Sequence, residues 1–150
     1  MDIRKLESKG LVNISFLQAD LMQPSANLVA VTNSMSRLHA IEHFGLRRYG
    51  DPINPVGHLH GFANMCAMLE PGGTLYVSFP IGREDQMHFN AHRVFHPTSI
   101  FDWPTGSSVL QLERFDYVDD REDLHLDYPL SEETSVTTYG CGIYTFRKAK

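Results

Sequence analysis

The sequence lacks the features of disulfide-rich, zinc-binding and membrane proteins. Its 150 residues include only two cysteines, Cys66 and Cys141, which lie far apart and match no zinc or redox spacing. A reducing, cytoplasmic location is therefore expected. No apolar run approaches the ~20 residues of a membrane span. The first ten residues contain no apolar stretch of the kind that a signal peptide needs. We expect neither secretion nor a membrane partner.

Positive charge is also scarce, with 13 Lys and Arg against 18 Asp and Glu and a net charge of −5. Nucleic-acid surfaces need an excess of positive charge, so no nucleic-acid partner is expected. The chain has no internal repeat, and its 42% of apolar residues is typical of a globular domain. Residues 1–150 are therefore expected to form a single domain. Histidine is the abundant type, with seven of the eight between His39 and His96.

Hydrophobic patterning predicts an α/β fold. Residues 58–69 have the apolar spacing of a helix, and Ser34 or Ser36 is a candidate N-cap for a helix that ends near Phe44. Strands are predicted at 12–18, 28–33, 74–81, 107–118 and 137–148. The early strands are separated by helices, which favours parallel pairing, whereas the last two long segments favour an antiparallel edge.

Three segments resemble parts of class I S-adenosylmethionine-dependent methyltransferases. LEPGGTLYVSFPIG (residues 69–82) is similar to the segment that leads into the fifth strand of that family. FLQADLM (residues 16–22) resembles the end of the third strand, and residues 28–45 resemble the fourth strand and its helix, which often ends in a Glu-His pair. IEHFGLRRYGDPINPVG (residues 41–57) and FNAHRVFHP (residues 89–97) look like a narrower, uncharacterised methyltransferase-like family, with Arg47 in place of its usual glycine.

This resemblance implies a partial Rossmann-like sheet, mostly parallel with an antiparallel C-terminal edge, that lacks the first two strands of the family. Those strands carry the glycine-rich loop and the acidic residue that hold the cofactor. Only eleven residues precede Val12, so we expect an N-terminally truncated domain. No cofactor is expected for the isolated chain, and S-adenosylmethionine only if a partner completes the sheet. The open edge of the 28–33 strand predicts a homodimer that covers it.

One residue is assigned to the cofactor by resemblance alone. In the methyltransferase family an acidic residue after the third strand lies near the adenine amine, and Asp20 occupies that place. The alternative is a turn aspartate that caps its own backbone.

Polar residues near the carboxyl ends of the predicted strands are the strongest ligand candidates, because open α/β sheets bind ligands at that rim. Arginines suit phosphate or carboxylate groups, and histidines near neutrality can move protons. We therefore predict catalytic roles for His43 and His92. The predicted ligand-binding residues are Glu42, Arg48, Tyr49, Asp51, Asn90 and Arg93. The alternative is that residues 48–51 only pin a loop and that Asn90 bonds backbone.

Two histidine patterns raise the question of a metal. His39, Glu42 and His43 fit the HxxEH signature, in which two histidines one helical turn apart bind one zinc ion. His88, His92 and His96 are spaced by four, but Pro97 favours a loop there. No third ligand is fixed for the first pattern, so no metal site is assigned.

The sequence therefore predicts a methyltransferase-like module that binds a small ligand or a partner without catalysis. Two alternatives remain open at this point. One is an S-adenosylmethionine-dependent methyltransferase completed by another chain or a dimer partner, and the other is a metal-dependent hydrolase that uses the histidines.

Overall fold

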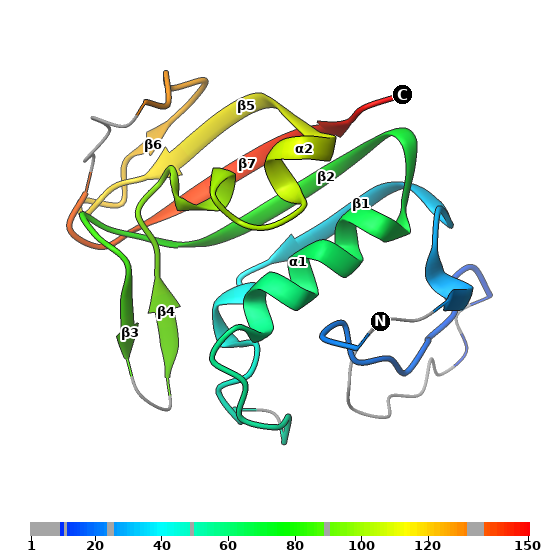
Figure 1. The fold of residues 1–150 in the computed structure, drawn as a ribbon. Coiled ribbons are helices and arrows are strands. Elements are labelled where there is room, and N and C mark those ends of the chain that lie inside the picture. Colours follow the sequence, from blue (N-terminus) through cyan, green and yellow to red (C-terminus); the bar gives the residue numbers. More distant parts are fainter. Residues whose placement is uncertain (1–9, 11, 24–25, 49, 89–90, 132–136) are drawn as a thin grey trace.

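The computed structural model describes residues 10, 12–23, 26–48, 50–88, 91–131 and 137–150, which form an α/β fold (Figure 1). In these residues five strands form the main sheet, in the order β1-β2-β7-β5-β6. These strands are β1 (Thr32–Leu38), β2 (Leu69–Ile81), β5 (Leu110–Val118), β6 (Leu124–His125) and β7 (Gly140–Lys148). The hairpin of β3 (Gln86–His88) and β4 (His92–Val94) stands apart from this sheet.

The strand directions confirm a mixed sheet with an antiparallel C-terminal edge. β1 and β2 pair in parallel, with Leu38 opposite Ser78. β2 and β7 pair antiparallel, with Pro80 opposite Cys141, and β5 is antiparallel to both β7 and β6. The parallel part is smaller than the sequence predicted, because among the described strands of the main sheet only β1 and β2 pair in parallel. Residues 38, 78 and 141 consequently lie at one end of the sheet.

Helices cover one face of the sheet, and the core lies beneath them. α1 (Gly57–Met68) and the short α2 (Gly106–Val109) lie in front of the main sheet in Figure 1. Alternate residues of β2 point to this face, and all of them are fully buried: Leu75, Val77, Phe79 and Ile81. They pack with Phe62, Met65, Trp103 and Tyr144 in one hydrophobic cluster. The centroid of the Phe79 ring lies 5.2 Å from that of Phe95 and 4.9 Å from that of Tyr144.

The structure confirms the predicted helix at 58–69 and the strands near 74–81, 107–118 and 137–148. The first two predicted strands and the helix between residue 34 and Phe44 are wrong. Residues 32–38 form β1 because their backbone pairs with β2, and this pairing outweighs the capping signal of the serines. The chain then turns at His39, where φ is 47°, so only the 3-10 turn η2 (Ile41–His43) follows.

The segment at 12–18 forms no strand, since its alternating apolar residues find no core to pack against. Val12 is 98% exposed and Ile14 58% exposed.

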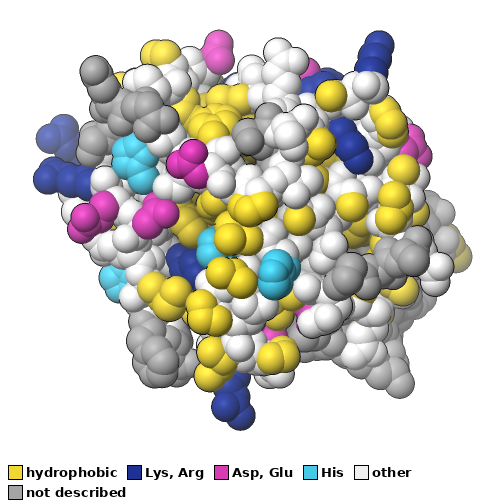
Figure 2. Space-filling view, in the orientation of Figure 1, with side chains coloured by type: hydrophobic (Ala, Val, Ile, Leu, Met, Phe, Trp, Pro, Cys, Tyr) yellow, Lys and Arg dark blue, Asp and Glu magenta, His cyan; other side chains and the backbone are white. Residues whose placement is uncertain are grey.

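Figure 2 shows hydrophobic side chains scattered among polar ones over the face drawn there. Among the described residues, no helix combines the length and the apolar character that a membrane span requires.

Replacing Phe79 with alanine should lower the free energy of unfolding by about 3–5 kcal/mol, because the change opens a cavity among aromatic rings. Urea unfolding followed by the fluorescence of Trp103, whose ring centroid lies 5.6 Å from that of Phe79, measures this effect. Met87, which is 53% exposed, provides the control, and Met87→Ala should change stability by no more than about 0.5 kcal/mol. A loss below about 1 kcal/mol in Phe79→Ala would contradict the packing described.

Candidate functional site

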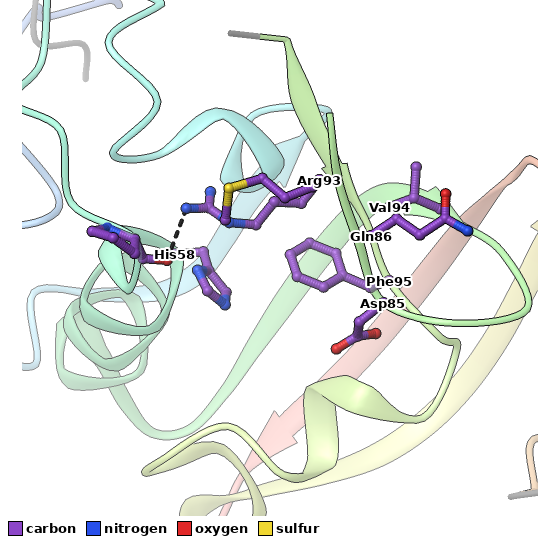
Figure 3. Close-up of a pocket in the computed structure, with 8 residues that line it drawn as sticks. His58, Asp85, Gln86, Arg93, Val94 and Phe95 are labelled. Carbon is purple, nitrogen blue, oxygen red and sulfur yellow. Dashed lines mark hydrogen bonds between the residues drawn. The ribbon is translucent and has the colours of Figure 1, made fainter. Parts of the chain in front are cut away.

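A pocket of about 260 Å³ opens between α1 and the β3–β4 hairpin (Figure 3). His58 lines it, with its ring centroid 5.3 Å from those of both Phe95 and Trp103. Burial lowers the pKa of His58 to about 4, so this imidazole is neutral at pH 7. Asp85 lines the same pocket, but its Oδ1 already accepts hydrogen bonds from the backbone of His96 and the hydroxyl of Ser99, both at 2.6 Å. The polar groups of this pocket mainly hold loops in place.

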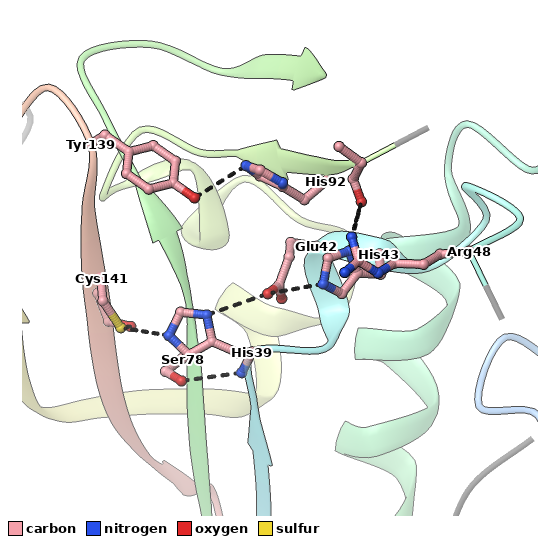
Figure 4. A network of polar contacts seen from close by, with 10 residues as sticks. His39, Glu42, His43, Arg48, Ser78, His92, Tyr139 and Cys141 are labelled. Carbon is pink, nitrogen blue, oxygen red and sulfur yellow. Dashed lines mark hydrogen bonds and ion pairs between the residues drawn. The ribbon is translucent and has the colours of Figure 1, made fainter. Parts of the chain in front are cut away.

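A cluster of polar side chains lies beside it, at the carboxyl end of β1 (Figure 4). The turn after β1 supplies His39, Glu42 and His43, while β4 supplies His92. The turn is held to the sheet by the backbone N–H of His39, which donates to the carbonyl of Ser78 at 3.0 Å. Because parallel strands place their carboxyl ends at the rim where α/β sheets bind ligands, this cluster is the candidate functional site.

Glu42 is the centre of the cluster and is only 1% exposed. Its Oε1 lies 3.4 Å from Nδ1 of His39 and 3.7 Å from Nε2 of His43. Nδ1 of His43 is 2.8 Å from the carbonyl oxygen of Ala91. A carbonyl oxygen only accepts, so Nδ1 carries a proton and Nε2 of the neutral ring is an acceptor facing Glu42.

A proton is therefore needed between Glu42 and His43. Burial raises the pKa of Glu42 and lowers the pKa of His43. Both shifts favour the uncharged pair, with the proton on the carboxyl group, because a buried charge is poorly solvated. The opposite directions of the two shifts bring the proton affinities of the carboxyl group and the imidazole closer together.

His92 lies at the open side of the cluster. Its ring centroid is 6.2 Å from that of His43, and its Nε2 is 3.2 Å from the hydroxyl of Tyr139. The pKa of His92 is lowered by burial and by the neighbouring charges of His88 and Arg48. Arg48 is exposed, and one of its Nη1 hydrogens points to the Ala91 carbonyl at 3.4 Å. The structure thus brings together four predicted residues: Glu42, His43, Arg48 and His92.

Two other predicted ligand-binding residues support the loops of the site. The guanidinium of Arg93, 2% exposed, donates to the carbonyls of Glu42, Phe44 and Pro55 at 3.3, 2.7 and 2.9 Å. Asp51 is also buried, and its Oδ2 accepts from the backbone of Gly45 at 2.8 Å. This arrangement fits the alternative in which the residues around Asp51 pin a loop.

The remaining predicted residues lie elsewhere. Tyr49 and Asn90 are outside the described residues. Asp20 lies in a turn in which its Oδ1 accepts from the backbone of Met22 at 2.9 Å, as in the turn alternative. The next carbonyl, of Leu21, accepts from Asn64 on α1, which places this turn beside the helix. Asp20 has no described contact with the Glu42 cluster.

The histidine patterns do not assemble a metal site in the described part of the chain, where no group of three His, Cys, Asp or Glu side chains is placed to hold an ion. His88 and His92 face each other across the hairpin with stacked rings, instead of lying on one helical face. His96 instead contacts the hydroxyl of Thr98 through its Nδ1 at 2.9 Å.

Sequence reasoning missed Cys141, Ser78 and Tyr139. Cys141 Sγ lies 3.1 Å from Nε2 of His39, although the two residues are 102 positions apart in the chain. Their meeting depends on the register of β7 against β2, which places Cys141 opposite Pro80. No motif or spacing in the sequence gives that register.

The stability of the protein should fall as the pH drops from 6.5 to about 4. Unfolded His58 takes up a proton near its ordinary pKa of 6.5, whereas the folded state resists protonation until about pH 4. The unfolded state therefore binds more protons in this window. His58→Phe, which keeps a ring beside Phe95 and Trp103, should flatten this dependence in urea unfolding measured at several pH values. His60→Gln, at an exposed histidine, is the control and should keep the full slope; an equal slope in His58→Phe would contradict the prediction.

Comparison with solved structures shows that the fold is methyltransferase-like. The [4+2]-cyclase SpnF matches with a TM-score of 0.57 at 12% identity over 87% of this chain and 55% of SpnF. The 1,6-didemethyltoxoflavin-N1-methyltransferase of Burkholderia thailandensis has a TM-score of 0.54 at 12% identity over 90% of this chain and 51% of its own. The N-methyltransferase NodS of Bradyrhizobium japonicum WM9 has a TM-score of 0.55 at 16% identity, with coverages of 95% and 58%.

The chain thus spans a little over half of the length of these structures, and at such low identity they show the fold alone. No curated protein matches the sequence. A protein-family profile described as "Caenorhabditis protein of unknown function, DUF268" matches residues 9–110. Since this match covers more than half of the chain, the chain belongs to the DUF268 family.

Proposed function

We propose that this chain is a methyltransferase-like module that binds a small ligand carrying a phosphate or carboxylate group at the carboxyl end of β1, without transferring a methyl group by itself. The observation that supports this most strongly is the excess of basic side chains around a buried acid whose pKa is raised by burial. Arg48, His43 and His92 meet at this rim, and the acid among them is Glu42.

The charges at the rim favour an anion. The positive charge of Arg48 lowers the pKa of both His43 and His92, which places all three groups within electrostatic reach of one another. Burial raises the pKa of Glu42 and so suppresses its negative charge. An anion bound beside Arg48 would replace this mutual repulsion with attraction.

The residues have distinct proposed roles. Arg48 and His92 contact the anionic group, because they lie on the open side of the cluster. Glu42 and His43 hold the proton that balances the charge of the ligand. Tyr49 and Asn90 flank these residues in the sequence and are proposed as further ligand contacts. Asp51 and Arg93 fix the loop through their backbone contacts.

Asp20 is not part of this proposal, because its carboxylate bonds within its own turn. β1 leads into His39 and β2 into residues 82–84, so neither parallel strand of the described sheet is followed by a glycine-rich loop. The proposed module therefore binds its ligand through side chains at the rim.

Inorganic phosphate should raise the pKa of His92 by roughly one unit, since a nearby anion favours the imidazolium form. Proton NMR of the histidine rings during a pH titration, with and without phosphate, measures this shift. Arg48→Met should remove the effect, while Arg83→Met, a matched change at an exposed arginine, should keep it. Titration curves that are identical with and without phosphate, or equally shifted in Arg48→Met, would refute anion binding at this rim.

A second candidate is an S-adenosylmethionine-dependent methyltransferase completed at the edge of β1. In the described sheet β1 has β2 as its one neighbour, and exposed sheet edges pair readily with further strands. This chain aligns with only 51–58% of the length of the three solved structures named above. A second copy of the chain is the simplest source of a strand, which would make the protein a homodimer.

Calorimetric titration of the 150-residue chain with S-adenosylmethionine separates the two candidates. The binding module should give no saturable heat at dissociation constants of about 10 μM or tighter. Saturable binding in that range would favour the methyltransferase, and sedimentation of the same sample would then show whether a dimer is the binding species.

A further inference from the structure

The thiol of Cys141 lies at the end of a chain of polar groups that leads to buried Glu42. Cys141 is near the start of β7, and its Sγ is 3.1 Å from Nε2 of His39. Nδ1 of the same ring is 3.4 Å from Oε1 of Glu42 (Figure 4). A thiol, an imidazole and a carboxyl group in this order form the arrangement that activates a cysteine nucleophile.

The hydrogen-bonding directions agree along the whole chain of groups. The S–H of Cys141 can donate to Nε2 of His39, whose Nδ1–H then points to Oε1 of Glu42. The proton of Glu42 in turn points to Nε2 of His43, whose Nδ1–H donates to the Ala91 carbonyl at 2.8 Å. The 3.4 and 3.7 Å separations exceed ordinary hydrogen bonds, and catalytic contacts often shorten only when substrate binds.

Glu42 supplies an independent sign of function. The residue is 1% exposed, and its Oε2 has no hydrogen-bond partner among the described residues. A buried oxygen without a partner destabilises the folded state, so it calls for an explanation. A carboxyl group that steers two imidazoles through its other oxygen provides one.

The backbone holds His39 in place for this role. His39 has a φ of 47°, in the left-handed region, and its N–H donates to the carbonyl of Ser78 at 3.0 Å. The hydroxyl of Ser78 also lies within hydrogen-bonding reach of Cys141 and favours the thiolate, opposing the stronger effect of burial, which raises the pKa of this thiol. Cys141 therefore rests as a thiol and needs a base when it reacts.

Solvent reaches the site at His39, whose side chain is 55% exposed, and at Cys141, which is partly exposed. Cys66, the other free cysteine, is 1% exposed, and burial raises its pKa to about 12. Only one of the two thiols is thus both accessible and next to a base.

We propose that Cys141 is a nucleophile that takes an acyl group from a small activated ester or thioester, with His39 as its base and Glu42 as a positioning residue. Sγ attacks the carbonyl carbon while its proton passes to Nε2 of His39. The bond from that carbon to the leaving oxygen or sulfur then breaks, and His39 returns the proton to the leaving group. Water subsequently cleaves the thioester, which restores the thiol and releases a carboxylic acid.

This activity goes beyond anion binding and is separable from it. Cys141→Ser should abolish acylation but leave the phosphate-induced shift of His92 unchanged, since Cys141 is not part of the proposed anion site. Arg48→Met is expected to lose the phosphate effect on His92, and Cys141 should still react with the probes in this variant.

The test uses p-nitrophenyl acetate and iodoacetamide as probes of the full chain. Mass spectrometry after a short reaction should find acetyl on Cys141 and none on Cys66, with a burst of p-nitrophenol equal to the amount of protein. His39→Gln should slow both acetylation and alkylation of Cys141 at least tenfold at pH 7. In this variant the reaction rate of Cys141 should rise only at alkaline pH, where an ordinary thiol loses its proton. His60→Gln, an exposed histidine elsewhere, should react like the unchanged protein.

Three results would overturn the proposal: an unreactive Cys141, equal rates in the unchanged protein and His39→Gln, or acetylation that persists in Cys141→Ser. Circular dichroism of each variant establishes that it is folded before rates are compared. For Glu42, a positioning role predicts that Glu42→Gln alters the pH profile of acylation and that Glu42→Asp restores part of it, whereas a packing role alone would leave the profile unchanged.

Discussion

One buried guanidinium holds together the loops on which the candidate site depends. Arg93 reaches from β4 to the carbonyls of Glu42, Phe44 and Pro55, and so joins the turn after β1 to the chain before α1. Burying the carbonyls of Glu42, Phe44 and Pro55 without hydrogen-bond partners would be costly. The charge of Arg93 is costly to bury as well, which appears as a lowered pKa, but carbonyl oxygens compensate for it. The position of Glu42 follows from this contact.

The chemistry of the site is a consequence of that burial. A carboxyl group held away from water keeps its proton more tightly, and an imidazole held there loses its proton more easily. The pKa of Glu42 is therefore raised and the pKa of His43 is lowered, so the two groups become closer in proton affinity than they are in water. His39 also contacts Oε1 of Glu42 but remains exposed, and this gives solvent and small molecules access to an imidazole that lies against a buried carboxyl group.

The parts of this structure that the sequence predicted are those governed by local pattern. Helix α1 and the strands β2 and β7 have clear apolar patterns and overlap the predicted segments, although β2 begins at Leu69, five residues before its predicted start. β1 was misplaced because its sequence, TNSMSRL, is polar and becomes a strand only through pairing with β2. Glu42, His43, Arg48 and His92 were found because two motifs carry them. The contact between His39 and Cys141 needed the three-dimensional register of the sheet.

The fold does not by itself select among the functions considered, since the solved structures that share it include a [4+2]-cyclase as well as methyltransferases. The arrangement of the site is more informative. The sheet residues that contact His39 are Ser78 of β2 and Cys141 of β7, which lie on the side of β1 that faces β2. The free edge of β1 lies on its other side. A strand added there would extend the sheet away from Cys141 and Ser78, so we expect the proton chemistry proposed for this rim to be independent of what completes the sheet.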